Sequence, residues 1–276
     1  MNNYFSFDDN DMHVHYSRSE HPLSSKFKMH THEFYELYYF QEGNAIYRIE
    51  GTPYQLKTGD ILIIRPTESH YVDILSDTPY TRLSIHFNPE LFSTIDPNSE
   101  LLKAYNNRQI GTHNLYRSEN FKTDSFDIYI KKIINTNKKS KLNLTVNLLQ
   151  ILNEISMAFE SLDENEGSKT LDKRIIDYIN RHITENISLD EICKRYSISK
   201  THLCRIFKKA TASTIGEYIT TKRLLNAKQL INSGIPPTKA YLDCGFKDYS
   251  VFYRAYRKKF NISPNEQKTV TFKCQK

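Results

Sequence analysis

Two segments near the end of the chain repeat one pattern: a short amphipathic helix, a polar turn, and a second helix with basic residues near its end. The first segment spans 188–209, and the second ends in 244–260. Two helices joined by such a turn form a helix-turn-helix unit, whose second helix can enter the major groove of DNA. Two units on one chain can read two successive grooves. The pattern therefore predicts an all-α DNA-binding domain over 169–276.

The distribution of charge also indicates nucleic acid as the partner of this domain. From residue 169 onward the chain holds 22 basic and 9 acidic residues, a formal charge of +13, while the remainder carries −7. Basic helices are often only solvated surfaces. Here the basic residues lie beside the predicted recognition helices, and such asymmetry favours binding of nucleic acid at the basic end.

The first predicted recognition helix begins after Ser199 and has one apolar and one polar face. Leu203, Ile206 and Phe207 share the inner face, because they are three and four positions apart. On the outer face, Arg205 can bond guanine O6 and N7, and short side chains can touch thymine methyl groups. The outer face comprises Lys200, Thr201, Cys204, Arg205 and Lys208.

The second predicted recognition helix has the same plan. Its inner face comprises Val251 or Phe252, followed by Ala255, Tyr256 and Phe260. Its outer face comprises Tyr249, Ser250, Tyr253 and Arg254, and a basic tail follows at 257–259.

Four segments of this region resemble the AraC/XylS family of bacterial transcription regulators: 203–209, 218–230, 244–246 and 252–264. The resemblance implies a fold in which one long helix joins two helix-turn-helix units. It also implies promoter DNA and RNA polymerase as partners. The implied base-reading positions are Thr201, Cys204 and Arg205 in the first unit, and Tyr249, Ser250, Tyr253 and Arg254 in the second.

Two positions depart from the family pattern. Ser197 stands where the family often has glycine, and Tyr241 stands where it usually has a small residue. A bulky side chain at the second position could shift the supporting helix. We therefore expect the second unit to dock on DNA less tightly than the first.

The front of the chain reads as short strands separated by turns. Runs rich in Tyr, Ile, Leu and Phe occupy 34–40, 45–49, 60–64 and 81–87. Regular strands with Gly and Pro turns indicate a β-sandwich or barrel. Because successive residues of 61–64 are all apolar, that strand is expected to be buried on both faces. The predicted class is α+β with two domains, and the barrel covers 1–100.

The spacing of His30, His32, Glu36 and Gly43, followed by Gly59-Asp60, Pro66 and His70, resembles the cupin motifs. In metal-dependent cupin enzymes such His and Glu positions bind a metal, so His30, His32, Glu36 and His70 are weak metal candidates. The alternative is a hydrogen-bond network that lines a ligand pocket, and we expect no cofactor. The expected pocket residues are His30, His32, Glu36, Tyr38, Tyr47, His70, Arg82 and His86, a set that suits a sugar or a similar polar metabolite.

The middle of the chain, 101–168, is expected to hold accessory helices at 121–134 and 142–159. In the second, Leu148, Leu152, Ile155 and Phe159 form one apolar stripe. The stripe could pack on its own barrel or form a dimer with a second subunit, and periodicity does not separate these. The polar segment 161–169 is predicted to be the interdomain linker.

The remaining features place the chain among proteins of the cytoplasm. The N-terminus lacks the basic start and apolar core of a signal peptide, and no apolar run reaches the ~18 residues that a membrane helix needs. The four cysteines lack zinc or redox spacing, which indicates a reduced compartment. The N-terminal segment 1–25 carries no clear pattern and is expected to be disordered.

Together these features predict a ligand-responsive transcription regulator, rather than an enzyme, that activates a metabolic operon. The linker and the N-terminal segment are the expected switching elements. A metal-dependent cupin enzyme is one alternative. A regulator that responds to no ligand and keeps a vestigial pocket is another.

Overall fold

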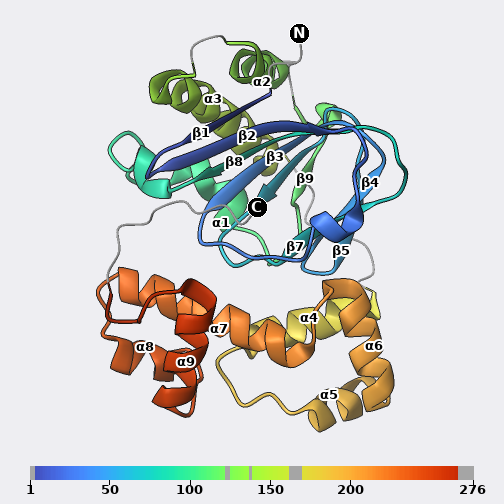
Figure 1. Cartoon of the computed structure of the whole chain (residues 1–276), viewed down its shortest axis with the longest axis vertical. Coiled ribbons are helices and arrows are strands. Elements are labelled where there is room, and N and C mark those ends of the chain that lie inside the picture. Colours follow the sequence, from blue (N-terminus) through green and yellow to red (C-terminus); the bar gives the residue numbers. More distant parts are fainter. Residues whose placement is uncertain (1–3, 122–124, 137–138, 162–169, 267–276) are drawn as a thin grey trace.

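The computed structural model describes residues 4–121, 125–136, 139–161 and 170–266. Figure 1 shows two domains: a β-rich N-terminal domain and a helical C-terminal domain. The predicted linker at 161–169 lies almost wholly outside the described residues.

Two antiparallel sheets form the N-terminal domain. Within the described residues, one sheet has the strand order β1-β2-β8-β3-β6-β9 and the other has the order β5-β4-β7. The strands are β1 Phe5–Asp8, β2 Met12–Ser19, β3 Tyr35–Glu42, β4 Ala45–Ile49, β5 Thr52–Gln55, β6 Ile61–Ile64, β7 His70–Ile74, β8 Tyr80–Phe87 and β9 Leu115–Tyr116.

The central strands of the larger sheet are buried on both faces, as predicted for 61–64. Ile61 and Ile63 belong to a core that includes the accessory helices, whereas Leu62 and Ile64 belong to a core between the sheets. All four residues are fully buried. Since successive side chains of a strand point to opposite faces, this domain is built in layers.

The accessory helices cover the outer face of the larger sheet (Figure 1). They are α1 Lys103–Asn106, α2 Ser125–Asn135 and α3 Lys141–Glu160. Leu148, Leu152 and Ile155 of α3 are fully buried in the same core as the strand residues, and Phe159 packs against it. Three of the four residues of the apolar stripe thus pack on their own domain.

The described part of the N-terminal segment, 4–25, holds two paired strands, which corrects the expectation of disorder there. β1 pairs with β2, and β2 pairs along its whole length with β8, from Met12↔Phe87 to Ser19↔Tyr80. Polar residues alternate with apolar ones in β2, where Met12 and Val14 are fully buried. One buried face is enough for a strand, although the composition of the segment is polar. β9 also extends the larger sheet beyond residue 100.

The C-terminal domain is all helical, as predicted. Its helices are α4 Leu171–Arg181, α5 Leu189–Tyr196, α6 Lys200–Thr211, α7 Ile215–Asn232, α8 Pro237–Asp243 and α9 Tyr249–Phe260. One core joins α4, α5, α6 and the start of α7, and a separate core joins the rest of α7 with α8 and α9. The long helix α7 therefore connects two small units (Figure 1).

Among the described residues, no helix combines the length and the apolar character needed to cross a membrane.

Candidate DNA-reading and effector-binding sites

The turn between α5 and α6 has the geometry of a helix-turn-helix unit. Ser197 ends α5 with a left-handed φ of 54°, the conformation that explains why glycine is common at such a position. The Ser199 side chain caps α6 by accepting a hydrogen bond from the His202 N–H at 3.2 Å. Ser188 precedes α5 but makes no side-chain cap bond.

The structure places the predicted reading residues of α6 on one exposed surface. Leu203 and Phe207 are buried beneath it, and this fixes the rotation of the helix. The Arg205 Nη2 lies 3.0 Å from the His202 Nδ1. Lys200 forms an ion pair with Asp190 of α5 at 2.8 Å. The exposed set comprises Lys200, Thr201, Cys204, Arg205 and Lys208.

The reading surface of α9 is less open than that of α6. Phe252 and Tyr256 are buried, as expected, whereas Val251 is half exposed. Tyr249 is only partly exposed, because its ring packs against the ring of Tyr241, with centroids 5.3 Å apart. The remaining predicted reading residues are Ser250 and Arg254, which are exposed, and Tyr253, which is partly exposed.

The predicted pocket residues of the N-terminal domain converge on the carboxylate of Glu36. Its Oε2 lies 3.0 Å from the Nε2 of His32, 3.2 Å from that of His70 and 3.5 Å from that of His86. Its Oε1 accepts a hydrogen bond from the Ser84 hydroxyl at 2.8 Å. We call His30, His32, Glu36, His70 and His86 the Glu36 cluster.

Three histidines of the Glu36 cluster are held in one tautomer by backbone carbonyls. The Nδ1 atoms of His30, His32 and His70 lie 2.8 to 2.9 Å from the carbonyl oxygens of Lys28, Phe34 and Glu68. A carbonyl oxygen only accepts, so each Nδ1 carries a proton, and a ring in its neutral form keeps a lone pair on Nε2.

The Glu36 cluster therefore directs hydrogen-bond acceptors at one another. Burial and the nearby His86 and His70 lower the pKa of His32 to about 4, so this ring is neutral near pH 7. The His70 Nε2 is buried without a hydrogen-bond donor among the described residues. A ligand's donor groups, a proton or a metal cation would satisfy these acceptors. Two triads could each hold one metal ion: His30–His32–His70 and His32–Glu36–His86. Within each triad the ligand atoms lie within 4.8 Å of one another.

An aromatic wall adjoins the cluster. Tyr38 and Tyr47 are both 2% exposed, and their ring centroids lie 4.7 Å apart. The Tyr47 ring also stacks on His70 at 6.0 Å. The Arg82 guanidinium lies over the ring of Tyr80, 5.5 Å from its centroid. All eight predicted pocket residues thus belong to one continuous region.

Ser84 and Tyr80 also belong to this region and were not predicted from the sequence. In the register of β3 and β8, Glu36 pairs with His86 and Tyr38 with Ser84. Residues at every second position of β8 share one face. That period was the signal for Ser84, because it lies between the predicted residues Arg82 and His86.

Glu50, which lies between the two domains, was not predicted as a functional residue either. Glu50 and Gly51 form the turn between β4 and β5 and have φ angles of 50° and 80°. Both positive values suit a two-residue hairpin. Gly51 has a φ of 80°, which favours glycine, and a Cβ atom there would lie 2.4 Å from the terminal methyl of Ile176 in α4. The turn carries Glu50 directly to the C-terminal domain.

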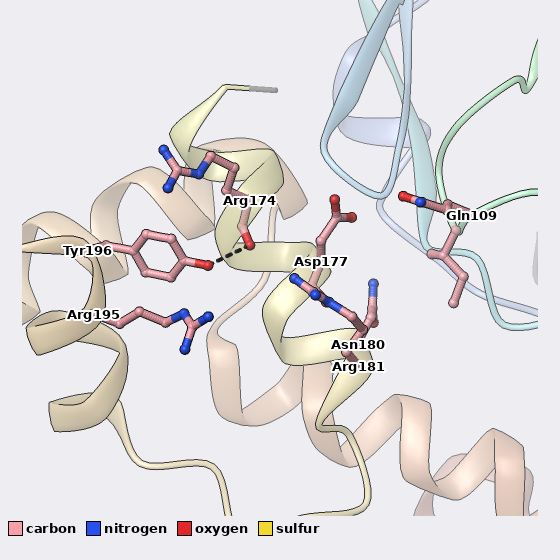
Figure 2. A pocket seen from close by; sticks show the side chains of 8 residues that line it. Gln109, Arg174, Asp177, Asn180, Arg181, Arg195 and Tyr196 are labelled. Atoms are coloured by element: carbon pink, nitrogen blue, oxygen red, sulfur yellow. Dashed lines mark hydrogen bonds between the residues drawn. The ribbon is translucent and has the colours of Figure 1, made fainter. Parts of the chain in front are cut away.

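A cavity of about 760 Å³ lies at the boundary of the domains. Gln109 faces α4 across it (Figure 2). None of the predicted site residues lines this cavity. Its eight lining residues, three of which are arginines, are Gln109, Ile110, Arg174, Asp177, Asn180, Arg181, Arg195 and Tyr196.

Comparison with known proteins matches both domains. The AraC-like ligand binding domain matches residues 15–118, and a helix-turn-helix domain matches residues 192–269. The HTH-type transcriptional activator RhaS of Escherichia fergusonii is 24% identical, and that of Escherichia coli (strain SMS-3-5) is 23% identical. Each alignment covers 87% of this chain and 87% of the relative.

Among solved structures, ToxT from Vibrio cholerae is 14% identical with a TM-score of 0.40, over 92% of this chain and 96% of that chain. The domain order, a ligand-binding domain followed by a helix-turn-helix domain, is the order seen in this structure. The chain is a DNA-binding transcription regulator, not an enzyme, and it belongs to the AraC/XylS family.

Proposed function

We propose that α6 and α9 each read one major groove of a promoter, and that a small polar effector bound at the Glu36 cluster controls this binding. The observation that carries the proposal is that both recognition helices keep base-reading side chains exposed while their apolar faces are buried. Arg205 in the first unit and Arg254 in the second are both exposed. Arginine is the side chain that most often reads guanine.

A test of the DNA-reading part uses the full chain and a duplex from the region upstream of its own gene. Arg205→Ala should weaken specific binding by about 1–3 kcal/mol and relax the preference at one base pair. Lys208→Ala, at the end of the same exposed surface, is the matched control. It should weaken binding to all sequences alike and reduce the salt dependence by about one counterion. Equal effects of the two variants on every sequence would refute base reading by Arg205.

The effector part rests on the excess of acceptors in the Glu36 cluster. A sugar or another polyhydroxylated metabolite would supply hydroxyl donors to Glu36 and to the Nε2 atoms, and Tyr38 and Tyr47 would offer apolar faces to its ring. Supporting this, the cluster joins one carboxylate with three imidazoles whose other nitrogens are already bonded.

A divalent cation is a second candidate effector for the same cluster. Histidines that bind a metal commonly donate their other ring N–H to a carbonyl oxygen, which is the arrangement of His30, His32 and His70. Neutral imidazoles and a carboxylate suit zinc and other first-row metals. Because the chain is related to transcription regulators, a bound metal would act here as the effector and not as a catalytic group.

One experiment separates these candidates. The melting temperature of the full chain is measured with a panel of sugars and, separately, with zinc chloride, and each hit is repeated on His32→Ala. A ligand of the native state raises the melting temperature. A sugar hit that His32→Ala abolishes supports the first candidate, and a zinc hit of equal dependence supports the second. No hit in either panel would favour a vestigial pocket.

We further propose that the regulator activates its target, a metabolic operon, through contact with RNA polymerase.

If the regulator dimerises, the interface between the two subunits must use a surface other than the buried α3 stripe. The exposed face of α3, with Leu142 and Val146 at 71% and 51% exposure, is the surface to probe.

A further inference from the structure

Glu50 is a buried residue of the N-terminal domain whose carboxylate contacts the C-terminal domain. It is 1% exposed. Its Oε1 accepts hydrogen bonds from the Lys222 ammonium and from the Ser69 N–H, the latter at 2.5 Å. Its Oε2 accepts from the Tyr218 hydroxyl and from the Asn180 Nδ2, the latter at 3.0 Å. One carboxylate of the N-terminal domain thus binds three side chains of the DNA-binding domain.

Glu50 and Lys222 form a buried ion pair between the domains, so removing either residue is expected to cost free energy. The side chains of Glu50 and Lys222 are 0% and 4% exposed. If one partner is removed, the other remains as a buried, unpaired charge, which is strongly unfavourable. Separation of the domains would return that charge to water. Removal of one partner alone is therefore expected to destabilise the observed arrangement of the domains.

Two links connect this ion pair to the Glu36 cluster through one short segment, 67–70. In the first link, the Thr67 carbonyl oxygen accepts a hydrogen bond from the Lys222 ammonium, and the Thr67 N–H donates to the carbonyl oxygen of His32 at 3.0 Å. Thr67 has a φ of 72°, which a β-branched residue adopts only when its surroundings hold it.

The second link runs through the next residues of the segment. The Ser69 N–H binds Glu50, and the adjacent His70 directs its imidazole at Glu36. The backbone of His70 also exchanges two hydrogen bonds with that of His30, both at 3.0 Å. A ligand that shifts the backbone of His70 would therefore also shift the Ser69 N–H that binds Glu50.

The interdomain contact leaves the reading surfaces uncovered. In the observed arrangement Thr201, Arg205 and Arg254 are exposed. Glu50 binds residues of α4 and α7, not of α6 or α9. Its role is therefore to position the DNA-binding domain, not to mask it.

We propose that Glu50 is the positioning residue that fixes the DNA-binding domain against the N-terminal domain, and that segment 67–70 carries the state of the Glu36 cluster to it. This inference rests on the proposed effector role of that cluster. It adds the path by which occupancy of the cluster is transmitted.

The test measures hydrogen exchange of the full chain by mass spectrometry and needs neither effector nor operator, so its outcome is separate from that of the proposed function. The variants are Glu50→Gln, Lys222→Met and the double variant. Glu42→Gln is the matched control, because Glu42 pairs with Arg18 on the surface of one domain. Three regions are followed: the interface helices (174–182 and 216–224), the segment 67–72, and the domain cores (61–64 and 203–207).

Each single variant should speed exchange at the interface and in 67–72 by about tenfold or more, and should leave both cores unchanged. The double variant should be no worse than either single variant, because the two changes remove one interaction. Small-angle scattering should show a larger radius of gyration for the Glu50 and Lys222 variants than for the unaltered chain, and no change for Glu42→Gln.

Three results would overturn the proposal. Unchanged interface exchange in both single variants would show that Glu50 does not hold the domains together. Faster interface exchange with no change in 67–72 would show that the segment does not report on the interface. Faster exchange throughout the cores would make Glu50 a folding residue and not a positioning one.

Discussion

Arg223, in the middle of α7, donates a hydrogen bond from its Nη1 to the carbonyl oxygen of Gly245 at 2.7 Å. Its Nε donates to the carbonyl oxygen of Ile183, also at 2.7 Å. One guanidinium thus bonds to the loop after α4 in the first unit and to the loop after α8 in the second. Since its planar donors have a fixed geometry, this contact helps to set how the two units face each other.

Gly245→Ala should therefore disturb the joint between the units. Gly245 has a φ of 83°, and a Cβ atom there would lie 2.3 Å from the carbonyl oxygen of Thr184. We expect a loss of about 2–3 kcal/mol of unfolding free energy, from strain and from the clash with backbone. Urea denaturation of the full chain measures it.

Gly216→Ala is the control for that variant. Nothing lies within 4 Å of a Cβ at Gly216, which stands in the first turn of α7. We expect no loss, and a gain of up to about 1 kcal/mol, because alanine favours the helix. If both variants lost stability equally, the close approach at Gly245 would not be the cause.

Arg254→Ala should weaken promoter binding less than Arg205→Ala. The second unit presents a less open reading surface, because Tyr249 packs on Tyr241 at the position where the family usually has a small residue. We expect a loss of about 1–3 kcal/mol for Arg205 and a smaller loss for Arg254. Fluorescence anisotropy with one labelled duplex measures both, and equal losses would contradict the order.

Glu68→Gln should destabilise the N-terminal domain and change its response to acid. Burial alone would raise the pKa of Glu68, but the Arg108 guanidinium, with Arg65 and the Gly111 N–H, lowers it to about 2. Its side chain is 0% exposed. Loss of this charge should cost about 3–5 kcal/mol, because Arg108 would remain buried without its partner.

The direction in which the free energy of unfolding changes with pH follows from the lowered pKa of Glu68. Because the folded-state pKa lies below that of the unfolded chain, this stabilisation is complete above pH ~4.5 and is lost as the pH falls towards about 2. Urea denaturation at pH 6 and at pH 3 should show a smaller acid effect in Glu68→Gln than in the unaltered chain. An identical acid effect in the two proteins would rule out Glu68 as its source.

Much of the fold was predictable because hydrophobic periodicity reports burial. The strand 45–49 lies where its pattern placed it, and the helix expected at 142–159 spans Lys141–Glu160. β2 was missed although His13, His15 and Ser17 alternate with apolar residues, because the alternating run is short and the segment around it is polar. Pairing with β8 stabilises this strand, and such a long-range contact leaves no local signal.

The candidate sites also contain some residues that the sequence pattern revealed and others that only contacts distant in sequence revealed. Spacing along the chain and along one strand identified Glu36 and the histidines around it, because motif residues keep fixed separations. Glu50 carried no such signal, since it occupies a turn and its partners Tyr218 and Lys222 lie in the other domain. Periodicity also could not tell which surface the α3 stripe would face, and only the packed core assigns it to its own sheet.

The measurement that tests the account most directly is a footprint of the full chain on DNA from upstream of its own gene, read at the guanines of each groove. Two recognition helices joined by α7 predict two protected major grooves on one face of the duplex, about 34 Å apart. Arg205→Ala should remove protection in one groove and Arg254→Ala in the other. Protection of a single groove, or loss of the same groove in both variants, would contradict a regulator that reads DNA with two units.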